Sequence, residues 1–259
     1  MKHFRFCIYL ALALIVFPAQ QSHADKATGI VLMHGKDGMG TSNSIVGKLA
    51  DRLSSDFTVR TPEMPWSRDN SLNQTLENSF RQIDAAVAEL KAAGATKIVI
   101  GGHSMGAAAA LAYATAHPEL AGVLMMAPGH RPDLHASKTA SVLAQARDLV
   151  AAGKPHDTVE IMDFNQGKKS TRVVEAEIAI SWFDPNGMAV MQNAAPKLSP
   201  DIPVLFILGE EDALLSVGKS LIYDKLPANP KSAYAVVPGG HMQTPIKGAG
   251  EIKAWLNHL

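Results

Sequence analysis

The run Gly102-His103-Ser104-Met105-Gly106 places a serine between two glycines, a spacing that suits nucleophilic chemistry. It follows an apolar stretch ending at Ile100 and precedes an alanine-rich stretch, so it predicts a sharp strand-to-helix turn. Such a turn would hold the Ser104 hydroxyl clear of the sheet, and the glycines would leave room for crowded backbone. Ser104 is therefore the candidate nucleophile. The alternative is a glycine-rich turn with a bystander serine.

A serine hydroxyl becomes a good nucleophile only when a base accepts its proton. His241 is the strongest candidate base, because it follows the last apolar run, in Pro238-Gly239-Gly240-His241. His130 also follows a predicted strand and is a second histidine expected near the pocket. His103 adjoins Ser104 and is expected to point away from the hydroxyl.

An acid should hold the imidazole in the correct tautomer and stabilise its charged form. Asp212 is the preferred candidate, since Leu208-Gly209-Glu210-Glu211-Asp212 follows a buried run. Glu210 and Glu211 are adjacent alternatives, and Asp133, after the preceding strand, is the rival position. The three neighbouring acids also fit a plain solvated turn.

The negative oxygen that forms during attack on a carbonyl needs N–H donors. The backbone N–H of Met105 is one candidate, because Met105 follows the nucleophile. The N–H of Lys36 is the other, within His34-Gly35-Lys36-Asp37-Gly38, where His34 is expected to be structural. The predicted substrate-binding residues are Trp66, His103 and Trp182.

These residues need a scaffold that brings distant segments to one edge. Five apolar runs are continuous rather than alternating, which is typical of parallel strands buried on both faces. They are Ile30–Met33, Lys97–Ile100, Val123–Met126, Val204–Leu208 and Ala233–Val237, with Phe57–Arg60 as a weaker sixth candidate. Helical patterns lie between them, at Ser44–Leu53, Leu72–Ala93, Ala107–Ala116 and Ile246–Leu259.

Strands that alternate with helices predict an α/β fold with a mostly parallel, doubly wound sheet and helices on both faces. Residues 131–200 interrupt the alternation and are expected to form a cap-like insertion above the sheet. Within it, Ala136–Ala152 has a helical pattern, Asn165–Thr171 is a polar stretch, and Trp182–Gly187 resembles an aromatic loop.

Residues 1–24 have the pattern of a secretory signal peptide. Lys2 and Arg5 supply the positive start, residues 6–17 form a short apolar core, and Ser22-His23-Ala24 is a small-residue cleavage site. This predicts a mature chain, residues 25–259, that is periplasmic or secreted and has no stable membrane span. The alternative is an uncleaved membrane anchor.

Composition excludes several classes of function. The 259 residues carry 24 basic and 24 acidic side chains, so the chain lacks the basic excess of an electrostatic nucleic-acid binder. Its only cysteine, Cys7, lies in the signal segment, which leaves no disulfide or thiol nucleophile in the mature chain. Gly35–Gly40 fits neither phosphate-loop pattern. His130, Asp133 and His135 are too few and too local to predict a metal site.

The order His34-Gly35, Ser104, Asp212, His241 resembles that of the α/β-hydrolase superfamily, over about residues 28–258. Exported bacterial esterase-like and lipase-like members are the most similar in pattern. The resemblance implies hydrolysis of a small-molecule ester through an acyl-enzyme, with no cofactor or metal and with the insertion as a cap. Lys36 and Asp37 follow Gly35, so the His-Gly-Gly-Gly loop of one esterase group is missing. The alternatives are a peptidase, a thioesterase, or a non-catalytic binding protein on the same fold.

Overall fold

The computed structural model describes residues 26–259, so the predicted signal peptide, residues 1–24, lies outside the described residues. Six parallel strands form the main sheet, in the spatial order β2-β1-β3-β4-β7-β8. They are β1 (Thr28–Met33), β2 (Thr58–Arg60), β3 (Lys97–Ser104), β4 (Gly122–Pro128), β7 (Val204–Gly209) and β8 (Ala233–Val237). Each coincides with one of the six predicted runs, which confirms the parallel sheet.

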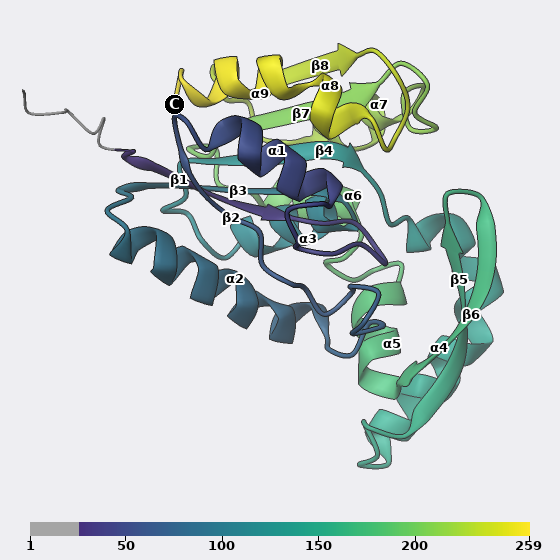
Figure 1. The fold of residues 1–259 in the computed structure, drawn as a ribbon. Helices are drawn as coiled ribbons and strands as arrows, with labels where there is room; N and C mark the ends of the chain where they lie inside the picture. The colour runs from purple at the N-terminus through teal and green to yellow at the C-terminus, as the bar shows by residue number, and fades with distance from the viewer. Residues whose placement is uncertain (1–25) are drawn as a thin grey trace, which may run out of the picture.

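Helices cover both faces of this sheet, as predicted (Figure 1). Alternate residues of β1 face opposite sides of the sheet. Ile30 and Leu32 pack against one layer of helices, and Val31 and Met33 pack against a second layer on the other face. The first layer contains α1 (Ile45–Leu53), α8 (Thr244–Lys247) and α9 (Ala249–Leu256), and the second contains α2 (Leu76–Ala92) and α3 (Met105–Ala114). Both faces of the strands are therefore buried, which explains their continuous apolar sequences.

Between β4 and β7 the chain leaves the sheet and builds the cap-like insertion, which Figure 1 shows beyond one end of the strands. It contains the 3-10 helix Pro132–His135, α4 (Ala136–Ala151), β5 (Thr158–Asn165), β6 (Lys168–Glu175), α5 (Ala176–Phe183), α6 (Met191–Ala194) and the 3-10 helix Ala195–Lys197. After β7 come α7 (Gly218–Leu221) and the 3-10 helix Tyr223–Lys225. The insertion thus lies near the edge from which the predicted site residues emerge.

The insertion contains an antiparallel hairpin, β5–β6, where the sequence predicted only a polar stretch. Its two-residue turn, Gln166-Gly167, has positive φ at both positions, 50° and 74°, as a tight hairpin turn requires. The turn was not predicted, because Gln-Gly is a weaker hairpin signal than Asn-Gly. The remaining sequence signal for this strand was the alternation of Val159 and Ile161 with polar residues, which are exposed along β5.

One loop prediction and two helix predictions differ from the structure. Trp182 and Phe183 end α5 instead of lying in an aromatic loop. The long second helix begins at Leu76, because the Thr75 side chain caps it by accepting from the N–H of Asn78. The C-terminal helix is divided at Gly248 into α8 and α9, and a Cβ at that glycine would lie 2.4 Å from Ile207 Cδ1.

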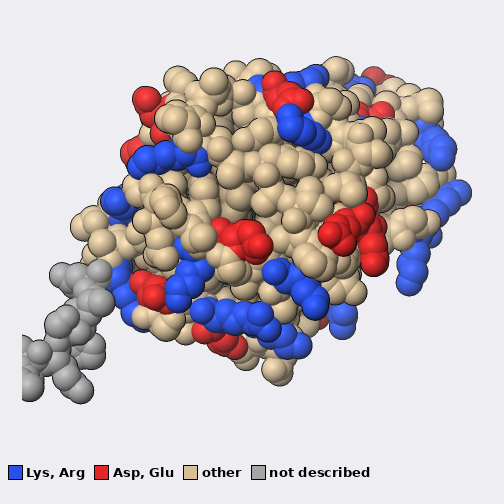
Figure 2. All heavy atoms as spheres, turned by 90° about the horizontal axis from the view of Figure 1, so that it is seen from above, with Lys and Arg blue, Asp and Glu red and all other residues tan. Residues whose placement is uncertain are grey.

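The surface of the described residues carries mixed charges. In the view from above, acidic and basic side chains are interspersed and form no continuous basic area (Figure 2). Within residues 26–259, no helix has the length and apolar character needed to cross a bilayer.

Candidate active site

The predicted catalytic residues and oxyanion donors lie at or just after the carboxyl ends of sheet strands. Ser104 ends β3, the 34–38 loop follows β1, Asp212 follows β7 and His241 follows β8. In a parallel sheet these ends meet at one edge, which is where open α/β sheets bind ligands. The fold therefore brings together segments that are up to about two hundred residues apart.

Ser104 lies on a strained strand-to-helix turn. Its φ of 55° and ψ of −119° are unusual for a residue with a side chain, and the β3–β4 register shifts at the same point. A Cβ at Gly102 would lie 2.1 Å from the carbonyl carbon of Gly106, and one at Gly106 would lie 2.7 Å from the Met33 oxygen. Glycine is required at both positions, which is the steric reason for the G-x-S-x-G spacing.

Asp212 and His241 form a hydrogen-bonded pair at this edge. His241 Nδ1 lies 2.8 Å from Asp212 Oδ2, and the N–H of Leu214 donates to the other carboxylate oxygen at 2.8 Å. Burial alone would raise the pKa of Asp212, but these two hydrogen bonds outweigh it and the pKa is lowered. Asp212 thus remains a carboxylate that can orient the imidazole.

The hydroxyl of Ser104 is not hydrogen-bonded to this Asp212–His241 pair. Although both residues are described, no hydrogen bond joins Ser104 Oγ to His241. Such contacts are often long before substrate binds. Ser104 nevertheless lies among the other site segments, since a Cβ at Gly35 would be 3.0 Å from Ser104 Cβ, and one at Gly129 would be 2.5 Å from Ser104 Oγ.

The rival acids have other surroundings. Asp133 accepts from Arg131 at 2.6 Å and from Gln192 at 2.9 Å, and no hydrogen bond in the described chain joins it to His241. Glu210 and Glu211 are exposed, in the turn between β7 and Asp212. The geometry around the imidazole therefore favours Asp212.

His103 contacts the backbone that carries His241. Its Nε2 donates to the His241 carbonyl oxygen at 3.0 Å, and the two ring centroids are 4.8 Å apart. Burial, with a smaller contribution from nearby His241, lowers the pKa of His103 to about 4. A neutral His103 holds the His241 loop in place, a role that sequence reasoning missed because the two residues are far apart in the chain.

The two predicted oxyanion donors come from segments that flank Ser104. Met105 is the first residue of α3, where N–H groups have no partner within the helix.

Lys36 lies in the loop after β1, which is anchored by His34. The N–H of Met64 donates to His34 Nε2 at 3.1 Å, so the proton is on Nδ1, which donates to the Gly35 carbonyl oxygen at 2.8 Å. Burial lowers the pKa of His34, in agreement with this neutral tautomer.

Trp66 and Trp182, predicted to bind substrate, are fully buried and pack edge to face, with ring centroids 5.3 Å apart. Trp66 Nε1 donates to the His34 carbonyl oxygen at 2.8 Å, and Trp182 Nε1 donates to the Gln74 carbonyl oxygen at 2.9 Å. In this conformation neither indole ring has exposed surface with which a substrate could make contact. The two tryptophans instead join the insertion to the loop after β1.

A cavity of about 1010 Å³ lies beside the Asp212–His241 pair. It is lined by both of these residues, by the segment after β4, by the β5–β6 hairpin and by the loop after β7. Phe164 and Phe183 are among its apolar residues, and sequence reasoning did not single out Phe164. The cavity size suits a small organic molecule.

His130 and Asp133, considered above as metal ligands, have protein partners instead. His130 Nε2 donates to the Trp182 carbonyl oxygen at 2.7 Å, and Asp133 pairs with Arg131. Within the described residues, only His156, Glu175 and Glu177 have ligand atoms grouped closely enough for a metal ion. They lie outside the cavity lining, and His156 pairs with Glu175 at 2.7 Å.

The fold and the strand-end site define an α/β enzyme scaffold of the hydrolase type. The chain belongs to the alpha/beta hydrolase family, whose model matches residues 30–248. A search of curated proteins finds no match.

Several solved structures share the fold at low sequence identity. A metagenome-derived lipolytic enzyme (LipS and LipT study) has 20% identity and a TM-score of 0.61, over 90% of this chain and 93% of the other. The monoacylglycerol lipase of Paleococcus ferrophilus has 18% identity and a TM-score of 0.60, over 88% and 93%. The proline iminopeptidase of Mycobacterium smegmatis has 17% identity and a TM-score of 0.55, over 90% of each chain. At these identities the likeness concerns the fold alone.

Proposed function

We propose that this hydrolase is a serine hydrolase that cleaves ester bonds through an acyl-enzyme, with Ser104, His241 and Asp212 as catalytic residues. The observation that carries the proposal is the hydrogen bond between His241 Nδ1 and Asp212, at the same sheet edge as a serine held at a φ of 55°. An acid, an imidazole and a serine on a nucleophile turn are the groups that acyl transfer requires.

In the proposed reaction, Ser104 Oγ attacks the ester carbonyl while His241 Nε2 accepts the hydroxyl proton. Asp212 accepts the Nδ1 hydrogen bond and stabilises the imidazolium that forms. The N–H groups of Met105 and Lys36 bind the oxyanion, and His241 then protonates the departing alcohol. Water, deprotonated by His241, attacks the acyl-enzyme; the bond between the acyl carbon and Ser104 Oγ breaks, His241 returns the proton to Ser104 Oγ, and the acid is released. The scheme needs no metal or cofactor.

A small-molecule ester is the proposed substrate class. The cavity beside His241 combines apolar residues such as Phe164 and Phe183 with histidines. The lipolytic enzymes of similar fold support an ester, and the iminopeptidase of similar fold keeps a peptidase as the second candidate. A thioesterase and a non-catalytic binding protein are the remaining alternatives.

Turnover of p-nitrophenyl esters tests the proposal, with matched thioester and anilide substrates. We expect ester turnover by wild type, loss of activity in Ser104→Ala, and a loss of about 10⁴-fold in Asp212→Asn because the imidazole loses its correct tautomer. Asp133→Asn is the matched control and should retain wild-type rates. Preferential anilide cleavage would favour a peptidase, and ligand binding without turnover would favour a binding protein.

We also propose that the protein is exported and acts in the periplasm or outside the cell. Residues 1–24 support this through their charged start, apolar core and cleavage pattern. The mass of the protein purified from its native host is the test. A chain beginning at Asp25 is expected, and a cytoplasmic chain that retains residues 1–24 would contradict export.

A further inference from the structure

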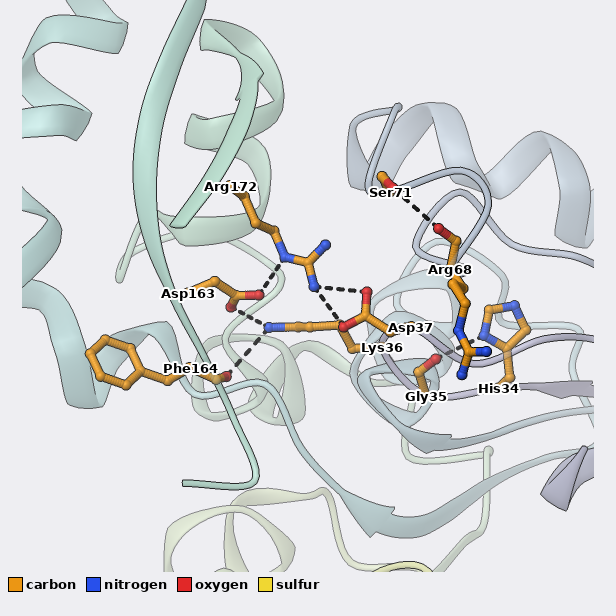
Figure 3. Close-up of polar contacts among 9 residues, drawn as sticks. All are labelled: His34, Gly35, Lys36, Asp37, Arg68, Ser71, Asp163, Phe164 and Arg172. Carbon is orange, nitrogen blue, oxygen red and sulfur yellow. Dashed lines mark hydrogen bonds and ion pairs between the residues drawn. The ribbon is translucent and has the colours of Figure 1, made fainter. Parts of the chain in front are cut away.

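Four charged side chains join the loop after β1 to the β5–β6 hairpin (Figure 3). Lys36 and Asp37 belong to the loop, Asp163 to β5 and Arg172 to β6. Lys36 Nζ donates to Asp163 Oδ1, and Arg172 Nε donates to Asp163 Oδ2 at 2.6 Å. Arg172 Nη2 also donates to the two oxygens of Asp37, at 2.8 and 2.7 Å. Asp163 thus bridges two cations that come from different elements.

The cluster is electrically balanced and largely shielded from water. The side chain of Asp163 is 2% exposed, that of Lys36 6% and that of Arg172 15%, whereas Asp37, at 39%, faces solvent. Burial alone would raise the pKa of Asp163, but the two cations outweigh it and the pKa is lowered. Because an unpaired buried charge is costly, removal of one member destabilises the arrangement of the others. The hairpin and the loop are therefore held in one relative position.

The opposite side of the same loop is also fixed. The N–H of Asp37 donates to the Trp66 carbonyl oxygen at 2.9 Å, and Trp66 Nε1 donates back to the loop at His34. Asp37 has a φ of 56°, in the left-handed region that Asp and Asn adopt more readily than other residues with side chains. The backbone of Lys36 thus lies between an anchor on the 64–68 segment and an anchor on the hairpin.

We propose that Asp163 and Arg172 are positioning residues, which hold the 34–38 loop so that the Lys36 N–H is aimed at the oxyanion above Ser104. This inference rests on the proposed function. It assigns the hairpin a part in transition-state stabilisation, although both of its residues act through the loop and touch no reacting atom. The Lys36 side chain serves as a tether, and only its backbone N–H serves the reaction.

The proposal predicts a specific kinetic pattern. An oxyanion donor stabilises the transition state more than the bound substrate, so its displacement lowers kcat and leaves KM nearly unchanged. Complete loss of such a donor costs about 10²- to 10³-fold in kcat. We expect about tenfold to a hundredfold lower kcat in Asp163→Asn and Arg172→Met, with partial recovery in Arg172→Lys, which keeps the charge but not the forked geometry.

The experiment measures kcat and KM for a p-nitrophenyl ester well below the unfolding temperature of each variant. Asp184→Asn is the matched control, because it breaks the Arg147–Asp184 ion pair inside the insertion without touching the loop. Near-wild-type kcat in both Asp163→Asn and Arg172→Met would overturn the proposal. So would a raised KM at constant kcat, or an equal loss in the control.

Hydrogen exchange of the 34–38 amides is a second readout that does not depend on activity. The proposal expects faster exchange in Asp163→Asn than in wild type or Asp184→Asn, and unchanged exchange would overturn it.

If wild type hydrolyses no ester, the proposed function fails by itself, and the exchange result still decides whether the hairpin positions the loop. Arg172 is partly exposed, so Arg172→Met serves if Asp163→Asn does not fold.

Discussion

Space around the Ser104 hydroxyl is limited by Gly129, the residue after β4. A Cβ at this position would lie 2.5 Å from Ser104 Oγ, well inside contact distance. In Gly129→Ala we expect the hydroxyl to rotate away from its productive direction. A misplacement of about 1 Å can cost about a hundredfold in rate, so we expect a loss of kcat of this order.

The matched control for Gly129→Ala is Gly250→Ala in α9, where an added Cβ meets no atom within 4 Å. Both variants should unfold at nearly the wild-type temperature, because the new methyl group of Gly129→Ala meets mainly a side chain that can rotate. Wild-type kcat in Gly129→Ala would contradict the position assigned to the nucleophile.

At the residue scale, sequence reasoning worked where a steric rule links neighbouring residues. The turn at Ser104 was predictable because Gly102 and Gly106 are needed within two residues of it. The hydrogen bond from His103 to the His241 carbonyl could not be predicted, since it joins residues 138 positions apart. Burial of Trp66 and Trp182 against one another was hidden for the same reason.

At the element scale, the start of α2 is set by one side chain. Thr75 Oγ1 accepts from the N–H of Asn78 at 3.1 Å and caps the helix. Thr75→Ala removes this acceptor and should lower the free energy of unfolding by about 1 kcal/mol, as measured by urea denaturation. Thr75→Ser keeps the hydroxyl and should stay close to wild type. Equal stability of the two variants would show that the cap contributes nothing.

The elements of the sheet were more predictable than those of the insertion. Buried parallel strands have continuous apolar sequences, so β1, β3 and β7 were evident. The hairpin was missed because the inward positions of β5 include Asp163 after Val159 and Ile161, so a charge interrupts the apolar alternation. That charge is compensated by Lys36, more than a hundred residues away.

For the whole molecule, buried histidines predict that stability falls in mild acid. Burial lowers the pKa of His103 and of His130 to about 4, from an ordinary value of 6.5. Between these values the unfolded chain binds protons that the folded chain does not, so the stability present above pH 6.5 is lost as pH falls towards 4. Burial also lowers the pKa of His34 and His135, which act in the same direction.

Each fully shielded histidine contributes about 1.4 kcal/mol per pH unit in this range, and partial exposure reduces the figure. Urea denaturation at pH 7, 6 and 5 measures the slope, and His103→Gln should make it shallower. A free energy of unfolding that does not change over this range would contradict the buried, neutral state of His103.

At the scale of the whole fold, the sequence predicted the sheet and its helix layers but not the contact between insertion and sheet. The alternation of apolar runs and helical patterns implies one sheet. The cluster of Lys36, Asp163, Arg172 and Asp37 depends on how the hairpin lies over the loop after β1. No local rule links those segments, so only the structure could reveal the cluster.

The most direct test of the central claim is covalent labelling of the folded protein with a fluorophosphonate, followed by intact mass measurement and peptide mapping. The account predicts one adduct, located on Ser104, that is lost in Ser104→Ala and after heat denaturation. Labelling that persists in Ser104→Ala, or a folded wild-type protein that acquires no adduct, would contradict it.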